Sequence, residues 1–342
     1  MIDFERLAAW MDENGLPGKG EPIEPRFLSG GTQNEIYELR RGDEGCVIRI
    51  PPLNAPADRD EGILREWRII EALEGTDVPH TPAIAVCEDA SVLGRPFYLM
   101  GFVDGWSPMT MGDSWPAPFN ADPNARAGLA YQLVEGIALL SRVDWQAKGL
   151  QTLGRPDGYH DRQVERWTRF FERIKNRELE GMDVASAWLS AHRPIDFIPG
   201  IMHGDYQFAN VMFKHGAPAK LAAIVDWEMG TVGDPKVDLG WTVQAWPKDT
   251  NAPDAAAATY VDMTGMPSRD EVVAHYGEVS GRQVDDIDYY VILAKWKLAI
   301  VLEQGFQRAG DDEKLLAFGP LIVDLMHGAA ELVESTDYDV RA

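Results

Sequence analysis

A chain of 342 residues, 45% of them hydrophobic and 25% charged, is long enough to bury a large core and to divide into two lobes. Its 55 acidic residues exceed its 32 lysines and arginines, so the formal net charge is −23, which argues against the basic surface of a nucleic-acid-binding protein. The two cysteines exclude a disulfide framework and are typical of apolar strand residues in a reducing compartment. We therefore expect a soluble, cytoplasmic protein.

The sequence predicts neither a signal peptide nor a membrane span. Residues 1–7 mix charged and apolar side chains and lack the basic segment and apolar run of a secretory leader. No run of about 18 consecutive apolar residues occurs, which is the length that a membrane helix needs. We expect no membrane partner.

The N-terminal part of the chain predicts a small α+β unit. Apolar residues at helical spacing over 1–16 are typical of a short amphipathic helix, which ends at the Pro17-Gly18 pair. Strand patterns follow, then a helical pattern with Ile63, Trp67 and Ile70 on one face, and then strands again. The expected elements are three strands between 23 and 50, a helix over 60–74, and two strands near 83–87 and 96–102. Five strands around one helix form such a unit.

Helical patterns dominate the rest of the chain. The stretch 106–123, rich in Pro, Met, Gly and Trp, predicts an irregular flap. Short strands and turns interrupt the helices only between 200 and 240, where 233–240 is rich in turn residues. The expected helices cover 124–142, 160–178, 183–192, 268–278, 285–309 and 312–335. We predict an α+β fold with a small N-terminal β-sheet lobe over 1–103, which binds nucleotide, and a larger, mostly helical catalytic and acceptor-binding lobe over 104–342.

The most informative stretch runs from His203 to Asn210. It places Asp205 five residues before Asn210, and Asp226 follows between apolar residues and a turn. Phosphoryl transfer from ATP needs an aspartate that accepts the proton of the attacking hydroxyl, and oxygen ligands that hold Mg²⁺ on the phosphates. A hairpin between the two motifs would bring Asn210 and Asp226 side by side, and these two ligands suffice for Mg²⁺. The pattern predicts a kinase of small molecules.

A glycine turn between the first two strands is a candidate phosphate-binding loop. Gly30, Gly31 and Thr32 lie at its centre, where a backbone without side chains approaches an anion closely and free N–H groups bind it. A Gly-Gly pair also forms ordinary hairpins, so this motif indicates nucleotide binding only together with the downstream residues.

Arg49 is a candidate cation for the α- and β-phosphates. It ends a strand that is otherwise apolar, and a glutamate of the following helix would hold it in place. Glu66 lies at a suitable distance along the chain, and Glu61 and Glu71 are alternatives. Strand alternation also permits Arg49 to face solvent, and helix carboxylates are most often solvated.

Several residues of the central motif have alternative roles. Asp205 is compatible with capping a helix, and we expect His203 to hydrogen-bond the loop backbone. A zinc site on these two residues lacks further histidines at useful spacing. Asp238 is expected to anchor the catalytic loop by accepting backbone N–H groups, and Glu228 either contacts the metal through water or faces solvent.

The motif residues described above, in their order along the chain, resemble those of the aminoglycoside phosphotransferase family, the small-molecule branch of the protein-kinase-like fold. The resemblance covers 26–308 and is strongest at 203–210 and 224–228. Further segments are similar to a subgroup related to the kinase domains of acyl-CoA dehydrogenase-linked proteins: 47–52, 65–67, 97–105 and 296–308. That subgroup is associated with phosphorylating hydroxyacyl substrates.

The resemblance implies a bilobal protein-kinase-like fold with ATP and Mg²⁺ as cofactors. It implies that Asp205 is the catalytic base and that Asn210 and Asp226 bind Mg²⁺. It also implies that Arg49 and Glu66 orient the phosphates. The backbone of Met100, Gly101 and Phe102 would contact the adenine.

Three departures from the kinase pattern affect these expectations. Gly204 replaces the arginine that protein kinases carry before the catalytic aspartate, so no switch by an activation-loop phosphate is implied. Arg49 stands where kinases generally carry lysine, which keeps the charge and changes the geometry. The glycine turn lacks a Gly-x-Gly-x-x-Gly pattern, which leaves its phosphate contacts open.

We therefore expect an ATP-dependent kinase whose partner is a small-molecule hydroxyl acceptor, with a hydroxyacyl compound as the first candidate. If Lys295, Lys297 and Arg308 face the pocket, they favour an anionic acceptor. The alternatives are a phosphotransferase of aminoglycoside or macrolide antibiotics and a non-catalytic nucleotide-binding pseudokinase. The Gly204 replacement and the helical insert at 150–200 disfavour a protein kinase.

Overall fold

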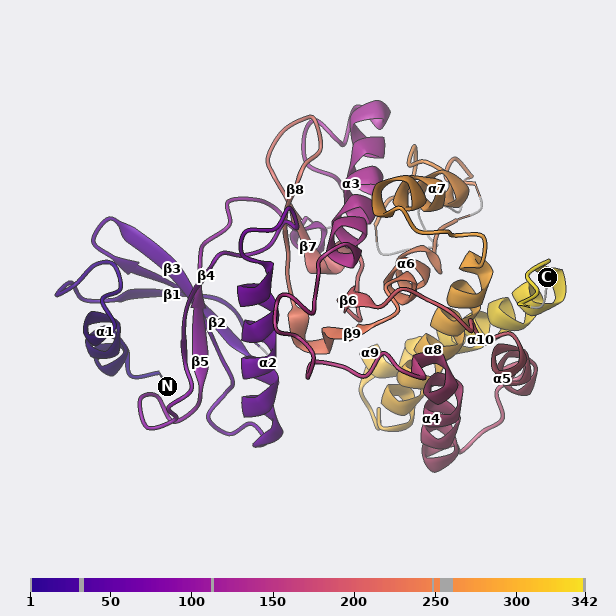
Figure 1. The fold of residues 1–342 in the computed structure, drawn as a ribbon, viewed down its shortest axis with the longest axis horizontal. Coiled ribbons are helices and arrows are strands. Elements are labelled where there is room, and N and C mark those ends of the chain that lie inside the picture. Colours follow the sequence, from indigo (N-terminus) through magenta and orange to yellow (C-terminus); the bar gives the residue numbers. More distant parts are fainter. Residues whose placement is uncertain (1, 31–33, 112–113, 248, 253–260, 341–342) are drawn as a thin grey trace.

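The computed structural model describes residues 2–30, 34–111, 114–247, 249–252 and 261–340, and it divides into a sheet-rich N-terminal part and a helical C-terminal part (Figure 1). The N-terminal part contains a five-stranded antiparallel sheet in the order β1-β2-β3-β5-β4. Its elements are α1 (Phe4–Glu13), β1 (Glu24–Gly30), β2 (Glu35–Arg41), β3 (Glu44–Ile50), α2 (Asp58–Leu73), β4 (Ala83–Cys87) and β5 (Phe97–Met100). The predicted α+β class, with a small N-terminal sheet and a mostly helical remainder, is confirmed.

Alternation along the strands gives the sheet two different faces. Ile48 and Leu99 point into a small core with Leu7 of α1. The opposite face packs against α2, where Tyr98 joins the cluster that contains Ile63. Arg49 is adjacent to Ile48 and is the register partner of Tyr98, so it lies on the face that α2 covers.

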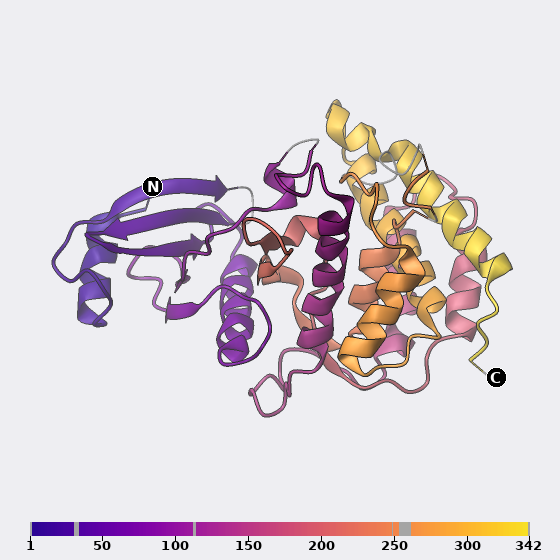
Figure 2. The same cartoon turned by 90° about the horizontal axis from the view of Figure 1, so that it is seen from above.

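The C-terminal part is mostly helical, and most of its helices match the predicted spans within a few residues. They are α3 (Pro123–Ser141), α4 (Tyr159–Ile174), α5 (Met182–Ala191), α6 (Lys236–Val243), α7 (Arg269–Ser280), α8 (Ile287–Gln307), α9 (Glu313–Leu316) and α10 (Phe318–Ser335). Figure 2 shows α7, α8 and α10 on the side of this part away from the sheet.

Two helix predictions need correction. The stretch 233–240, interpreted as turn-rich, contains most of α6, because Asp234 and Pro235 begin this helix rather than a loop. The single helix predicted over 312–335 is divided at Ala317 into α9 and α10. Pro320 is tolerated there because it lies in the first turn of α10.

Between α5 and α6, short strands carry the central motif. Antiparallel pairs form between β6 (Gly200–Met202) and β9 (Thr231–Gly233), and between β7 (Val211–Phe213) and β8 (Leu221–Ile224). The second pair is the predicted hairpin. It brings the two motifs together, since the N–H of Val225 donates to the carbonyl oxygen of Asn210 over 3.0 Å.

A short linker joins the two parts of the chain. After β5 it reaches Trp106, which exchanges two backbone hydrogen bonds with Phe213 and stacks on its ring. Gly105 is required at this crossing, because a Cβ atom there would lie 2.6 Å from the carbonyl oxygen of Phe213. The largest apolar cluster continues from α2 into the C-terminal part, and the division at 103 and 104 stays a prediction.

The stretch Glu313–Ser335 passes a length and composition test for a membrane helix, with mean hydropathy 1.4 and 28% of its most apolar window buried. The test is also passed by core helices of soluble proteins, and α10 packs against α8 and α5. The absence of a membrane partner stays a prediction.

Candidate active site

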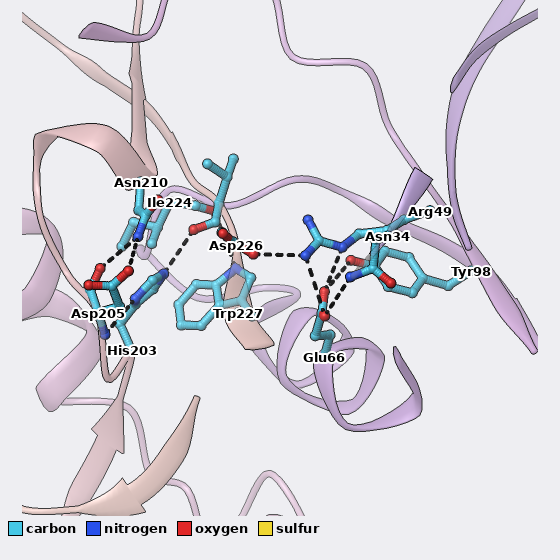
Figure 3. Close-up of polar contacts among 11 residues, drawn as sticks. Asn34, Arg49, Glu66, Tyr98, His203, Asp205, Asn210, Ile224, Asp226 and Trp227 are labelled. Atoms are coloured by element: carbon cyan, nitrogen blue, oxygen red, sulfur yellow. Dashed lines mark hydrogen bonds and ion pairs between the residues drawn. The ribbon is translucent and has the colours of Figure 1, made fainter. Parts of the chain in front are cut away.

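Three side-chain donors orient the carboxylate of Asp205 at the start of the predicted catalytic loop. Its Oδ1 accepts hydrogen bonds from Nε2 of Gln207 at 2.9 Å and from Nε1 of Trp241 at 2.8 Å. Its Oδ2 accepts from Nδ2 of Asn210 at 3.0 Å (Figure 3). Charge-assisted bonds of this kind fix both oxygens of an acceptor, as a positioned proton acceptor requires.

The loop that carries Asp205 is anchored to α6 by hydrogen bonds. Both oxygens of the buried Asp238 accept backbone N–H groups, from His203 at 2.6 Å and from Gly204 at 2.8 Å, which confirms the predicted anchor. Burial raises the pKa of Asp238, and these donors oppose that effect. Nε2 of His203 donates to the carbonyl oxygen of Val225 at 2.8 Å, as expected for a structural histidine.

Gly204 has a steric reason to replace the arginine of protein kinases. Its φ is +87°, and a Cβ atom there would lie 2.6 Å from the carbonyl oxygen of Met229. Any side chain would therefore push the catalytic loop away from the turn that follows Asp226.

Arg49 and Glu66 form a buried ion pair, with Nε and Oε2 2.8 Å apart (Figure 3). Tyr98 donates its hydroxyl to the same carboxylate at 3.1 Å, and Nδ2 of Asn34 approaches it at 3.4 Å. Burial raises the pKa of Glu66 to about 7 against the opposing effect of Arg49. The choice of Glu66 as partner is confirmed, and the phosphate-orienting role of the pair stays a prediction.

The second carboxylate at Arg49 belongs to Asp226, whose Oδ1 accepts from Nη2 over 2.7 Å. Burial opposes the charge of Arg49, but Tyr98, Glu66 and Asp226 together keep its pKa above the usual value. Asp226 is the only described non-glycine residue with positive φ, at 66°. This left-handed turn points its half-exposed side chain into the space between the two parts of the chain.

Asn210 and Asp226 supply a donor set that fits Mg²⁺. The amide nitrogen of Asn210 is bound to Asp205, so its carbonyl oxygen remains as a ligand atom, and Asp226 keeps one carboxylate oxygen beyond its contact with Arg49. Among the described residues, no group of three or more His, Cys, Asp or Glu could hold a metal ion. Mg²⁺ needs no such group, because phosphate oxygens and water complete its shell.

The other predicted nucleotide-binding residues are distributed around this space. Gly30 ends β1, while Gly31 and Thr32 lie outside the described residues. Gly101 donates its N–H to the carbonyl oxygen of Pro82 at 2.8 Å, so this group is already used. Phe102, another predicted adenine contact, is the next residue in the chain, and its side chain is half-exposed.

Asp205 opens onto a cavity of about 690 Å³ between α6, α8 and α10. Most of its lining is apolar, including Phe208, Leu298 and Leu325. Lys297 also lines it, with Nζ 5.2 Å from the ring centres of both Trp167 and Trp241. Burial lowers the pKa of Lys297, in part opposed by Asp238.

Of the three cations named on the helix 285–309, only Lys297 lines this cavity. Lys295 lies against Gly328 of α10, and Arg308 is exposed at the end of α8.

The sequence interpretation did not identify Trp241, Gln207 or Tyr98 as site residues. Trp241 directly follows the stretch taken as turns and lies in α6, the helix that was missed, so no pattern pointed to it.

Comparison with known proteins gives the same fold and family. The pattern of the phosphotransferase enzyme family matches residues 24–272. A solved structure from Ralstonia eutropha, provisionally assigned as an aminoglycoside phosphotransferase, covers 99% of this chain and 100% of its own, with TM-score 0.82 and 29% identity. A structure of aminoglycoside phosphotransferase APH(4)-Ia with ADP and hygromycin B aligns over 96% of this chain and 98% of its own. Its TM-score is 0.57 and its identity is 10%, which shows likeness of fold alone.

Curated relatives include two longer proteins. Mouse acyl-CoA dehydrogenase family member 10 is 28% identical over 84% of this chain and 27% of its own length. Human acyl-CoA dehydrogenase family member 11 is 27% identical over 90% of this chain and 39% of its own length. The chain thus spans less than half of these relatives. Because the family pattern matches most of the chain, this protein belongs to the phosphotransferase enzyme family.

Proposed function

We propose that this protein is an ATP- and Mg²⁺-dependent kinase that phosphorylates a hydroxyl group of a small hydroxyacyl compound. The observation that carries the proposal is Asp205, oriented by three donors at the mouth of an apolar cavity that contains Lys297. Asp205 accepts the proton of the acceptor hydroxyl. The hydroxyl oxygen forms a bond to the γ-phosphorus of ATP while the bond between that phosphorus and ADP breaks. Asn210 and Asp226 would hold Mg²⁺, which neutralises phosphate charge.

The lining of the cavity favours an acyl chain with an anionic or carbonyl group. Asp205 is the only carboxylate among the described residues that line it. A polycationic aminoglycoside would need several carboxylates there, while Lys297 suits a carboxylate or a thioester carbonyl. The names of the relatives, which are acyl-CoA dehydrogenase family members, also support an acyl substrate.

The remaining alternatives are an antibiotic phosphotransferase and a nucleotide-binding pseudokinase. The complete set of Asp205, Asn210 and Asp226 supports catalysis over the pseudokinase.

We also propose a cytoplasmic location and a functional division into a nucleotide-binding lobe over 1–103 and a catalytic lobe over 104–342.

The test is Mg·ATP-dependent ADP release across a panel of acceptors: hydroxyacyl-CoA esters, free hydroxy acids, aminoglycosides and macrolides. We expect turnover with hydroxyacyl compounds that Asp205→Asn abolishes. Turnover confined to an antibiotic would replace the proposed acceptor. Bound ATP with no turnover across the panel would contradict the proposal in favour of the pseudokinase.

A further inference from the structure

A second cavity, of about 630 Å³, adjoins the first one and differs from it in charge. The two cavities share Trp167, Gly204, Met229 and Lys297, so they meet directly beside the catalytic loop. None of Arg49, Asn210 and Asp226 lines the second cavity, which separates it from the proposed nucleotide site.

The second cavity concentrates positive charge in a strongly acidic protein. Six cations line it, against two carboxylates, although the whole chain has a net charge of −23. Helix α4 contributes three of them, and α2, α8 and the loop before α4 contribute one each: Arg162, Arg166 and Arg169, then Arg65, Lys297 and Arg155. A concave surface of one sign attracts and holds anions of the other sign.

Backbone carbonyls and one ion pair hold part of this arginine cluster in place. Arg65 donates to the carbonyl oxygens of Gly230 and Leu153. Arg162 donates to those of Asp157 and Arg155, and these neutral acceptors leave its charge uncompensated. Arg169 is paired with Glu165 across one helical turn. The cluster is therefore partly preorganised, which lowers the cost of binding.

Arg155 and Arg166 are the groups best suited to contact a ligand. Both are exposed, and in the described part of the chain neither guanidinium has a hydrogen-bond or ion-pair partner. Arg166 lies over the ring of Trp167 at 5.7 Å, at the wall between the two cavities. Guanidinium groups in this arrangement match phosphate oxygens, to which they donate two parallel hydrogen bonds.

We propose that this arginine cavity binds the phosphate groups of the carrier to which the acyl acceptor is attached as a thioester. The inference rests on the proposed function, because it divides one acceptor between two adjoining cavities. The acyl chain enters the apolar cavity with its hydroxyl at Asp205, Lys297 lies at the junction near the thioester, and the phosphates occupy the arginine cavity.

The site itself is tested by calorimetry with coenzyme A, with the nucleotide site filled by Mg²⁺ and a non-hydrolysable ATP analogue. The variant is Arg155→Gln with Arg166→Gln, and the matched control is Arg173→Gln on the same helix outside the cavity. We expect the double variant to raise the Kd about tenfold or more, with the control and the melting temperature unchanged. An unchanged Kd in the double variant would overturn the proposal.

Fragment probes separate a thioester carrier from a free phosphate. Pantetheine, which lacks the phosphates, should bind equally to wild type and the double variant. Inorganic pyrophosphate should bind more weakly than coenzyme A and lose binding in the double variant. Pyrophosphate that binds as tightly as coenzyme A would overturn the carrier assignment.

Turnover distinguishes failure of this inference from failure of the proposed function. With a hydroxyacyl-CoA ester, the double variant should raise KM and leave kcat and the KM for ATP unchanged, while the matching pantetheine thioester should show no change. If coenzyme A binding depends on the arginines but no thioester is phosphorylated, the function fails and the site stands. If thioesters are phosphorylated regardless of the arginines, the site fails and the function stands.

Discussion

Asp205 combines two properties that the central motif needs. Its carboxylate is fixed by Gln207, Asn210 and Trp241, and it lines the apolar cavity. The first two donors come from the same loop and are local, whereas Trp241 comes from α6. The geometry of the proposed base thus depends on both the loop and α6.

Replacing Asp205 with Asn keeps the shape of the side chain and removes the proposed proton acceptor. We expect kcat to fall by roughly 10²–10⁴, the contribution of general base catalysis, with nucleotide affinity nearly unchanged. Single-turnover kinetics and calorimetry with ATP measure the two quantities. Turnover within about tenfold of wild type would contradict the assignment of Asp205 as base.

Trp241→Phe tests the contribution of the indole donor to Asp205. The variant keeps an aromatic ring near Lys297 and loses one hydrogen bond to a charged acceptor, so we expect kcat to fall roughly tenfold with KM for ATP unchanged. Trp115→Phe is the control, because its Nε1 donates to the carbonyl oxygen of Asp262 instead. An equal loss in both variants would point to a general packing effect.

Asp226→Ala tests the metal assignment. It removes a proposed Mg²⁺ ligand and one of the two carboxylates at Arg49. We expect ATP affinity in the variant to become insensitive to Mg²⁺, whereas wild type binds ATP more tightly with Mg²⁺ than with a chelator. Calorimetry under both conditions gives the result, and an unchanged Mg²⁺ dependence would exclude Asp226 as a ligand.

Among the elements, α2 and β3 are coupled through one buried ion pair. The pair depends on strand alternation, which turns Arg49 toward α2, and on a helix whose apolar face turns Glu66 toward the sheet. Tyr98 completes the contact from the neighbouring strand β5. The position of α2 relative to the sheet therefore controls the position of Arg49.

The raised pKa of Glu66 predicts a pH dependence of stability. Burial moves this pKa from 4.5 to about 7, so between these values the folded protein binds a proton that the unfolded chain has released. The stabilisation from Glu66 is therefore present at low pH and is lost as pH rises through this window. We expect the free energy of unfolding of wild type, relative to Glu66→Gln, to decrease over the same range.

Urea unfolding at several pH values measures this difference. Glu71→Gln is the matched control, because Glu71 lies exposed on the same helix. A difference between wild type and Glu66→Gln that stays constant from about pH 4.5 to 7 would contradict the prediction.

Element prediction succeeded where local pattern decides the structure. The long helices were found because their apolar periodicity extends over several turns. The helix α6 was missed because it spans only Lys236–Val243 and follows Gly233, Asp234 and Pro235, which alone are typical of a turn. Its packing against α8 stabilises it, and that contact is not visible in its own sequence.

At the scale of the whole molecule, the net charge of −23 implies self-repulsion in the folded state. Screening over about 10 Å at 0.1 M salt reduces this repulsion. We expect the melting temperature to rise when sodium chloride is added at low ionic strength. Sucrose at matched osmolality is the control, because it does not screen charge, and a melting temperature that falls with added salt would contradict the prediction.

The sequence by itself determined the fold class and the central motif, and it favoured Glu66 over Glu61 and Glu71 as the partner of Arg49. These follow from short-range information: periodicity, strand alternation and residue spacing along one loop. Only the tertiary structure decided that Trp241 orients Asp205, that Lys297 alone of three candidate cations faces the apolar cavity, and that the arginines of α4 gather beside it. These contacts join helices far apart in the chain, and their mutual rotation depends on packing that no local pattern records.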